Sequence, residues 1–140
     1  MDIERLLHAL NNDNNEAIVE LDYNKIAKDK NDILQQLNLP RDELKKLQQN
    51  LKLYRLVDNI DDLRYGSYIR WILLKDPANI KLTNGGVVCD MKAIKDDIHI
   101  KCKNRINYMF QVKMNEAHIF QKLSEQEQVI LSALKHLQLP

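Results

Sequence analysis

The feature that most constrains the fold of this chain is a change in the spacing of its apolar residues near residue 63. Before that point apolar residues recur every three or four positions, which is the period of an amphipathic helix. After it they alternate with polar residues, which is the period of a strand with one buried face. Helical spacing returns at residue 124. The sequence therefore predicts an α+β fold, with an N-terminal helical segment (1–62), an antiparallel β segment (63–123) and a C-terminal helix (124–140).

Three stretches of the N-terminal segment predict helices. An Asn- and Asp-rich run at 11–15 ends the first, and Pro40, which disfavours a helix, separates the second from the third. Asp42 and Glu43 lie in the first turn of the third helix, where negative charge interacts favourably with the helix dipole. The apolar faces consist of Ile3, Leu6, Leu7 and Leu10, then Ile26, Ile33, Leu34 and Leu37, then Leu44, Leu47, Leu51 and Tyr54.

The β segment predicts five short strands, at 68–74, 80–83, 87–94, 98–103 and 108–114. Asn84-Gly85 separates the second strand from the third, and Asn-Gly is a strong hairpin signal because both residues tolerate a positive φ. Short runs of turn-forming residues separate the other strands. Five short antiparallel strands, each with one apolar face, predict a curled or small barrel-like sheet.

The alternation also assigns side chains to the two faces of the predicted sheet. In the strand at 98–103, Ile98, Ile100 and Cys102 share one face, and the other face carries His99, Lys101 and Lys103. In the last strand Lys113 points away from the face that Tyr108, Phe110, Val112 and Met114 share. One face is therefore expected to be core and the other basic.

A capping box marks the start of the C-terminal helix. Ser124 and Glu127 have the spacing at which each side chain bonds the backbone N–H of the other residue. Ile119 and Phe120, just before it, predict a hydrophobic staple. Because this helix follows the sheet and has an apolar stripe to bury, we expect one domain over residues 1–140.

Charge is distributed unevenly along the chain, although the net charge is only +1. Residues 1–62 contain nine basic and thirteen acidic residues, a net charge of −4, and residues 63–123 contain eleven and five, a net charge of +6. A basic sheet face suits a phosphate backbone. Two alternatives stay open: the lysines only keep that face solvated, or the acidic helices dock on the sheet and neutralise it.

The segment 64–71 concentrates aromatic residues and arginines where the helical and β segments meet. Arg64, Tyr65, Tyr68 and Arg70 belong to residue types that are enriched in binding surfaces. In the alternative interpretation Arg70 pairs with an acidic residue of a helix. Trp71, which is the only Trp, is expected in the core.

The sequence shows no catalytic, metal-binding or cofactor motif. His99 and Cys102 are three positions apart in a regular strand, so they project to opposite faces and cannot bind one ion together with Cys89. Gly85 and Gly86 lie outside any phosphate-loop pattern. We therefore expect no enzyme activity, no metal and no cofactor.

The chain also lacks the pattern of a membrane span or of a secretory leader. Its longest run of aliphatic or aromatic residues, at 71–74, is far short of the roughly 20 residues that cross a bilayer. Its first residues are of mixed charge. Two cysteines are too few for a disulfide framework. We expect an intracellular protein that does not enter a membrane.

Three runs, Tyr-Gly-Ser-Tyr-Ile-Arg-Trp-Ile at 65–72, Lys-Leu-Thr-Asn-Gly-Gly at 81–86 and Ile-Phe-Gln-Lys-Leu-Ser at 119–124, resemble small proteins of nucleocytoplasmic large DNA viruses. The resemblance covers about residues 50–135. It implies a protein made in a host cell and associated with the virion core or the viral gene-expression machinery, with viral or host proteins as partners. It transfers no functional residue, because none is assigned in that group.

These observations favour a non-enzymatic binding module whose basic β face contacts DNA or RNA. A protein–protein interaction or structural role in a larger complex stays open, and an exposed apolar stripe on the first helix, or a homodimer, would favour it. A third alternative, a hydrolase, needs a Cys and a His within hydrogen-bond distance. The residues expected to contact phosphates are Arg64, Arg70, Lys81, Lys101, Lys103 and Lys113, and those expected to stack on bases are Tyr65 and Tyr68.

Overall fold

The computed structural model describes residues 2–12, 15, 18 and 22–138. Its helices of eight or more residues are α1 (Ile3–Leu10), α3 (Tyr23–Gln35), α4 (Arg41–Asn50) and α5 (Glu125–Gln138). Its strands are β1 (Tyr54–Val57), β2 (Tyr68–Leu73), β3 (Gly86–Ile94), β4 (Asp97–Lys103), β5 (Met109–Lys113) and β6 (Ala117–Lys122). Two single-turn 3₁₀ helices, η2 (Ile60–Asp62) and η3 (Met114–Glu116), lie between strands. The predicted α+β class is confirmed.

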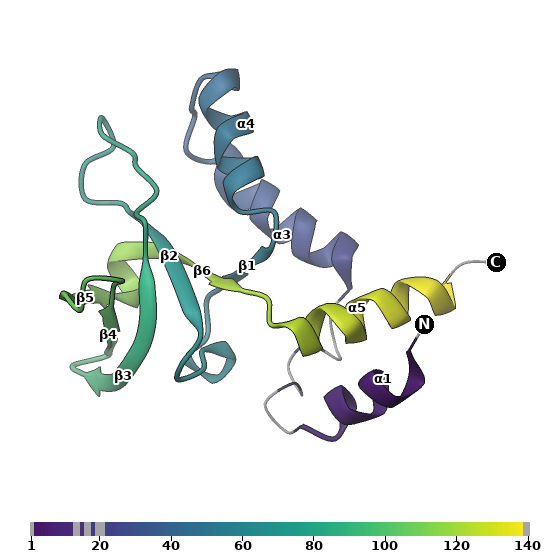
Figure 1. Cartoon of the computed structure of the whole chain (residues 1–140). Helices are drawn as coiled ribbons and strands as arrows, with labels where there is room; N and C mark the ends of the chain where they lie inside the picture. Colours follow the sequence, from purple (N-terminus) through teal and green to yellow (C-terminus); the bar gives the residue numbers. More distant parts are fainter. Residues whose placement is uncertain (1, 13–14, 16–17, 19–21, 139–140) are drawn as a thin grey trace.

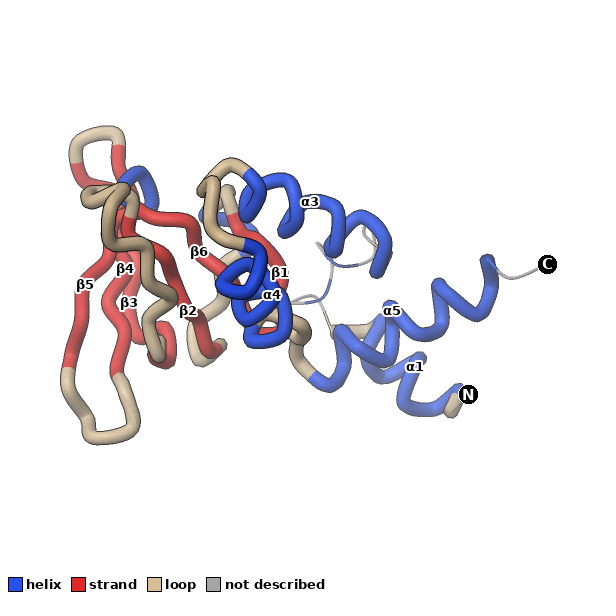
Figure 2. Tube along the Cα trace, turned by 90° about the horizontal axis from the view of Figure 1, so that it is seen from above, coloured by secondary structure: helices blue, strands red, loops and turns tan. Residues whose placement is uncertain are grey.

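The strands form one antiparallel sheet in the order β1-β6-β2-β3-β4-β5 (Figure 2). The sheet is open, with β1 and β5 as its edges, so the barrel-like arrangement expected from the sequence does not close. The sheet is nevertheless curled. The rings of Trp71 on β2 and Phe110 on β5 have centroids 6.4 Å apart, whereas a flat sheet would place strands three positions apart at about 14 Å.

Three of the predicted strand assignments differ from the structure. Residues 80–83 do not form a strand, because only Leu82 forms a bridge to β2 and the segment folds back against that strand as a loop. Tyr54, expected on a helix, begins β1. Ile119 and Phe120, expected to form a staple, lie within β6 between β1 and β2. The two strands missed from the sequence are therefore neighbours in the sheet.

The two faces of the sheet are packed differently. The inner face forms a core of residues from the strands and their loops: Val57, Leu63, Ile69, Trp71, Val88, Ile100, Cys102, Val112, Ala117 and Ile119. On the outer face of β1, β6 and β2, a second core joins Ile72 and Phe120 to Leu34, Leu47 and Leu51 from α3, α4 and the residue after α4. In Figure 1, α3 and α4 lie over this part of the sheet. The predicted core position of Trp71 is confirmed.

A third apolar cluster joins the first and last helices. Leu6 and Ala9 of α1 pack with Ile130 and Leu131 of α5. The predicted capping box is confirmed: Ser124 Oγ accepts from the backbone N–H of Glu127 at 3.1 Å, and Glu127 Oε1 accepts from the backbone N–H of Ser124 at 2.9 Å. Glu127 also forms an ion pair with Arg64, which ties α5 to the loop before β2.

Candidate nucleic-acid interface

The outer face of the sheet is uncovered over β3, β4 and β5. Tyr68, Val87, Lys103 and Met109 are successive register partners across β2, β3, β4 and β5, so they share one face. Lys101 lies on the same face two residues earlier in β4. Both lysines are exposed. Ile100 and Cys102, which alternate with them along β4, are buried in the inner core. The alternation predicted for this strand is confirmed.

A groove of about 670 Å³ continues this face toward β2, β6 and β1. Tyr68 and Arg70 are alternate residues of β2, and Lys122 of β6 is the register partner of Tyr54 at the start of β1. The turn before β3 and the turn between β4 and β5 form the other walls of the groove. The residues that line the groove are Tyr54, Tyr68, Arg70, Asn84, Gly85, Asn104, Arg105, Ile106 and Lys122.

The turn at Asn84-Gly85 holds one wall because it lies directly against β2. Gly85 has a φ of +83°, and a Cβ at this position would lie 2.0 Å from the carbonyl oxygen of Ile69. Only glycine fits such an approach. The neighbouring backbone is fixed by side chains of β2: Arg70 Nε donates to the Thr83 carbonyl at 2.7 Å, and the Tyr68 hydroxyl donates to the Asn84 carbonyl.

The turn between β4 and β5 holds the other wall. Asn104 Oδ1 accepts from the backbone N–H groups of Ile106 and Tyr108, at 3.1 Å and 2.9 Å. Asn107 takes a positive φ of 62°, which Asn tolerates better than most residues. This closed turn leaves Arg105 and Ile106 exposed, and the side chain of Ile106 is 81% exposed.

The charge of this surface is strongly one-sided. Three cationic residues, Arg70, Arg105 and Lys122, line the groove, and no acidic residue of the described part of the chain does. Burial raises the pKa of the Tyr54 hydroxyl, which Arg70 opposes and Tyr68 reinforces, so these three side chains lie within electrostatic reach of one another. Burial of Tyr54 therefore favours its neutral form.

Most of the cations on this surface lack an acidic partner among the described residues. No ion pair involves Lys101, Lys103, Arg105 or Lys122. Asp90, the register partner of Lys101, has its carboxylate 3.8 Å from Lys92 Nζ. The ion pairs of α3 are internal to that helix, between Lys25 and Asp29 and between Lys28 and Asp32.

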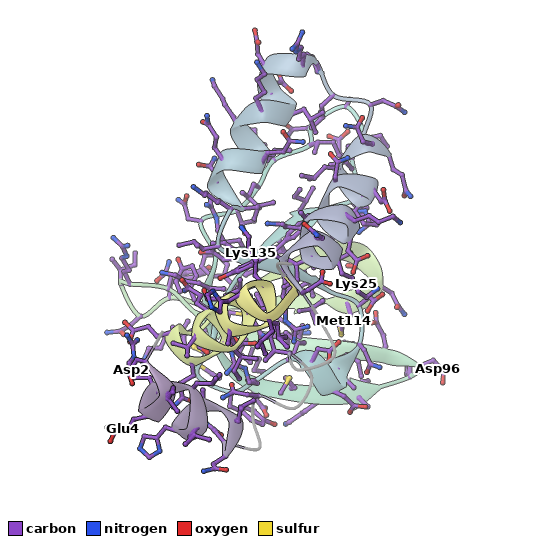
Figure 3. The ribbon with its side chains drawn as sticks, turned by 90° about the vertical axis from the view of Figure 1, so that its right-hand side faces the viewer. Asp2, Glu4, Lys25, Asp96, Met114 and Lys135 are labelled. Carbon is purple, nitrogen blue, oxygen red and sulfur yellow. The ribbon has the colours of Figure 1, made fainter. Side chains whose placement is uncertain are left out.

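The acidic helices do not cover the basic face. Asp2 and Glu4 of α1 are exposed and project away from the sheet (Figure 3). The helix acid that does reach the β segment is Glu127, and its partner is Arg64 rather than Arg70. The sequence-based alternative that paired Arg70 with a helix acid therefore applies to a different arginine.

The structure brings together only some of the residues expected to bind nucleic acid. Tyr68, Arg70, Lys101 and Lys103 share the outer face, and the first two also line the groove. Lys113 lies on the same face one register step beyond, opposite His99, with Glu116 Oε1 at 3.9 Å.

Arg64, Tyr65 and Lys81 lie apart from this surface. The guanidinium of Arg64 is largely buried against Glu127. Tyr65 is 64% exposed in the loop before β2, next to Gly66. Lys81 is exposed in the loop that follows β2, between Ile80 and Leu82, which pack on the outer core.

Three residues of the groove were not anticipated from the sequence: Tyr54, Arg105 and Lys122. Each comes from a different segment, and the sequence offered no reason to group Tyr54 and Lys122 with Tyr68 and Arg70. The signal that selected Tyr68 and Arg70 was local composition. The strand order β1-β6-β2 is what brings Tyr54 and Lys122 to them, and that order has no local signature.

The cysteines and histidines do not assemble into a reactive pair on β4. Burial raises the pKa of the Cys102 thiol to about 12, whereas His99 lies on the opposite face, with Nδ1 2.8 Å from Gln111 Nε2. In the part of the chain that the structure describes, no group of three or more His, Cys, Asp or Glu side chains is placed to hold a metal ion. No described helix is both long and apolar enough to cross a bilayer.

An apolar stripe on α1 is also exposed. Ile3, Leu7 and Leu10 are 64%, 54% and 46% exposed, while Leu6 and Ala9 on the other side of the same helix pack against α5. An exposed apolar stripe on this helix is the feature that the sequence analysis named as favouring a protein–protein interaction role.

Comparisons with known proteins leave this surface without a precedent to draw on: no protein-family model, no curated protein and no solved structure matches the chain.

Proposed function

We propose that this protein binds single-stranded nucleic acid on its basic surface, by which we mean Lys101 and Lys103 of β4 together with the groove residues Tyr54, Tyr68, Arg70, Arg105 and Lys122. The observation that carries the proposal is an uncovered sheet face that leads into a groove which, among the described residues, is lined by three cationic side chains and no acidic one. Cations that form no ion pair are available for phosphate contacts, and none of the five cations of this surface forms one among the described residues.

The composition of the surface suits a single strand better than a duplex. Tyr54 and Tyr68 lie among the cations, and stacking of bases on aromatic side chains requires unpaired bases with accessible faces. Tracks that combine a basic groove with aromatic side chains typically hold four or more nucleotides, roughly the extent of one small β domain. A duplex would present only its backbone and grooves to the tyrosines.

The test is fluorescence anisotropy of an internally labelled single strand across a salt series. The wild-type protein is expected to bind at low salt and to weaken steeply as salt rises, because bound phosphates release counterions. The variant Lys101→Glu with Lys103→Glu is expected to lose about tenfold or more in affinity and to show a shallower salt dependence. Binding that persists at high salt, or that the variant leaves unchanged, would contradict the proposal.

The matched control is Lys45→Glu with Lys46→Glu on α4. Both lysines are exposed, so this variant makes the same change in net charge on the acidic half of the molecule. Its affinity should stay within about twofold of wild type, because charges beyond a Debye length of about 10 Å are largely screened. Equal losses in the two variants would show that net charge, and not this surface, controls binding.

A second candidate function is self-association through α1, which the exposed stripe of Ile3, Leu7 and Leu10 favours. The partner that we name is a second copy of the chain. In an antiparallel two-fold arrangement centred on Leu7, Ile3 of one helix faces Leu10 of the other, so the stripe complements itself. Light scattering during size-exclusion chromatography should then give a dimer that Leu7→Asp converts to a monomer. A wild-type monomer at high concentration would remove this candidate.

The biological setting of either function stays a prediction. A place in viral gene expression or in a virion core is implied by the resemblance of the chain to small viral proteins, and both settings supply single-stranded nucleic acid and other proteins as partners.

A further inference from the structure

The groove lies at one end of the basic surface. On the side of β3 and β4 the surface continues through Val87 to Lys103, which are register partners. On the side of β1 it stops at Tyr54, which packs against the apolar cluster formed with α3 and α4. A nucleic-acid strand that follows the lysines of β4 therefore reaches the groove, where Tyr54 and the apolar cluster behind it block its further path.

The charge in the groove exceeds what an internal phosphate requires. An internal phosphodiester carries one negative charge, whereas a terminal phosphomonoester carries close to two at neutral pH and has three free oxygens. Three cationic residues from three separate segments converge here: Arg70 of β2, Arg105 of the β4–β5 turn and Lys122 of β6. Among the described residues the hydrogen bond of Arg70 uses Nε alone, and Arg105 and Lys122 form no ion pair.

The size and the walls of the groove fit a nucleotide. Its volume of about 670 Å³ lies in the range of pockets that hold small organic ligands. Tyr54 and Tyr68 supply aromatic rings beside the cations, and the exposed Ile106 borders the open side. A base can stack on a tyrosine while its phosphate contacts the guanidinium groups.

We propose that the groove is an end-binding subsite, which holds the terminal nucleotide of a single strand through its phosphomonoester, with Arg70, Arg105 and Lys122 as the phosphate ligands and the two tyrosines beside the base. This inference rests on the proposed function, since the rest of the strand lies along Lys103 and Lys101. It adds selectivity for a phosphorylated end, which a uniform basic track does not have.

The experiment is competition by unlabelled strands of one sequence against an internally labelled probe. The competitors are a 5′-phosphorylated strand, a 3′-phosphorylated strand, a strand with two hydroxyl ends and a covalently closed circle. One of the phosphorylated strands should compete roughly tenfold better than the circle, the effect of about one charge-assisted hydrogen bond. The phosphorylated strand that competes better identifies whether the groove binds the 5′ end or the 3′ end.

Three variants separate this subsite from the rest of the surface. Arg105→Gln with Lys122→Gln changes exposed side chains, so the fold is expected to persist, and the advantage of the phosphorylated end should fall to within about twofold. Lys101→Gln with Lys103→Gln should weaken all four competitors together and leave their ratio unchanged. Arg70→Gln should behave as the first variant does.

The outcomes distinguish the two proposals. If the circle competes as well as both phosphorylated strands, the end-binding subsite is wrong while nucleic-acid binding stands. The subsite is also wrong if the advantage of a phosphorylated end survives in the Arg105 and Lys122 variant. If none of the strands binds at low salt, the nucleic-acid function itself fails, and the subsite fails with it.

Discussion

The outer face of the sheet is covered by helices over one half and open to solvent over the other. Over β1, β6 and β2 the outer face carries Ile72 and Phe120, fully buried beneath α3 and α4. Over β3 and β4 the same face carries Val87, Lys101 and Lys103, and all three are exposed. The groove lies where the covered half gives way to the open half. The comparison teaches that the helices stabilise one half of the sheet and, by stopping short, leave the other half available for binding.

Two arginines near this boundary show the same division. Arg64 is 22% exposed and pairs with Glu127, whose backbone and side chain also complete the cap of α5. Arg70 lines the groove, and its side chain donates one hydrogen bond, to a backbone carbonyl, among the described residues. Both were expected from the sequence to bind phosphate. The structure places the first in an ion pair with α5 and leaves the second without an ion pair among the described residues.

The largest expected effect comes from truncation in the covered half. Phe120→Ala should lower the free energy of unfolding by about 3–5 kcal/mol, because it opens a cavity between β6 and the helices. Met109→Ala on the open half of the same face should cost less than about 1 kcal/mol, since Met109 is 49% exposed. Urea unfolding followed by circular dichroism measures both. Similar losses at the two positions would contradict the division of the face.

A smaller loss is expected from breaking the buried ion pair. Arg64→Gln leaves the carboxylate of Glu127 buried without a charged partner and should cost about 2–3 kcal/mol, reduced from a fully buried pair because Arg64 keeps some solvent contact. Arg70→Gln should cost less than about 1 kcal/mol. In the double variant Arg64→Gln with Glu127→Gln the loss should be smaller than the sum of the two single losses. Strict additivity would show that the pair does not couple α5 to the sheet.

The covered half should also respond to pH through His118 on β6. Burial lowers the pKa of His118, so folding favours its neutral form. The resulting stability is present above the unfolded-state pKa of about 6.5 and is lost as the pH falls toward the lowered folded-state pKa. Urea unfolding between about pH 7.5 and 5.5 should show this decline, and His118→Gln should flatten it. An unchanged slope in the variant would place the titrating group elsewhere.

The sequence predicted what depends on neighbours in the chain. Pro40, the Ser124–Glu127 box and the alternation at 98–103 each act over a few residues, and the structure has the helix boundaries and the strand faces that they predict. The sheet was predicted less completely, because β1 is only four residues long and follows α4 closely. Its partner β6 stands directly before the cap of α5, where an apolar pair also suits a staple.

The candidate site was predicted to the same extent, and for the same reason. Tyr68, Arg70, Lys101 and Lys103 were selected by local composition and by the two-residue period. Tyr54 and Lys122 face one another because β1 pairs with β6, and Arg105 joins them because the β4–β5 turn closes on Asn104. Pairings between distant segments are set by the packing of the whole sheet, which no short stretch of sequence contains.

The smallest expected effect on stability belongs to the lysines of the open half. Lys101→Gln with Lys103→Gln should change the free energy of unfolding by no more than about 0.5 kcal/mol, because both side chains are exposed and neither has an ion-pair partner among the described residues. Affinity for a single strand should fall in the same variant. A measured loss of stability above about 1 kcal/mol would mean that these lysines support the fold, and the open half would then lose its distinction from the covered half. Unchanged stability with unchanged affinity would instead show that these lysines only keep the open half solvated.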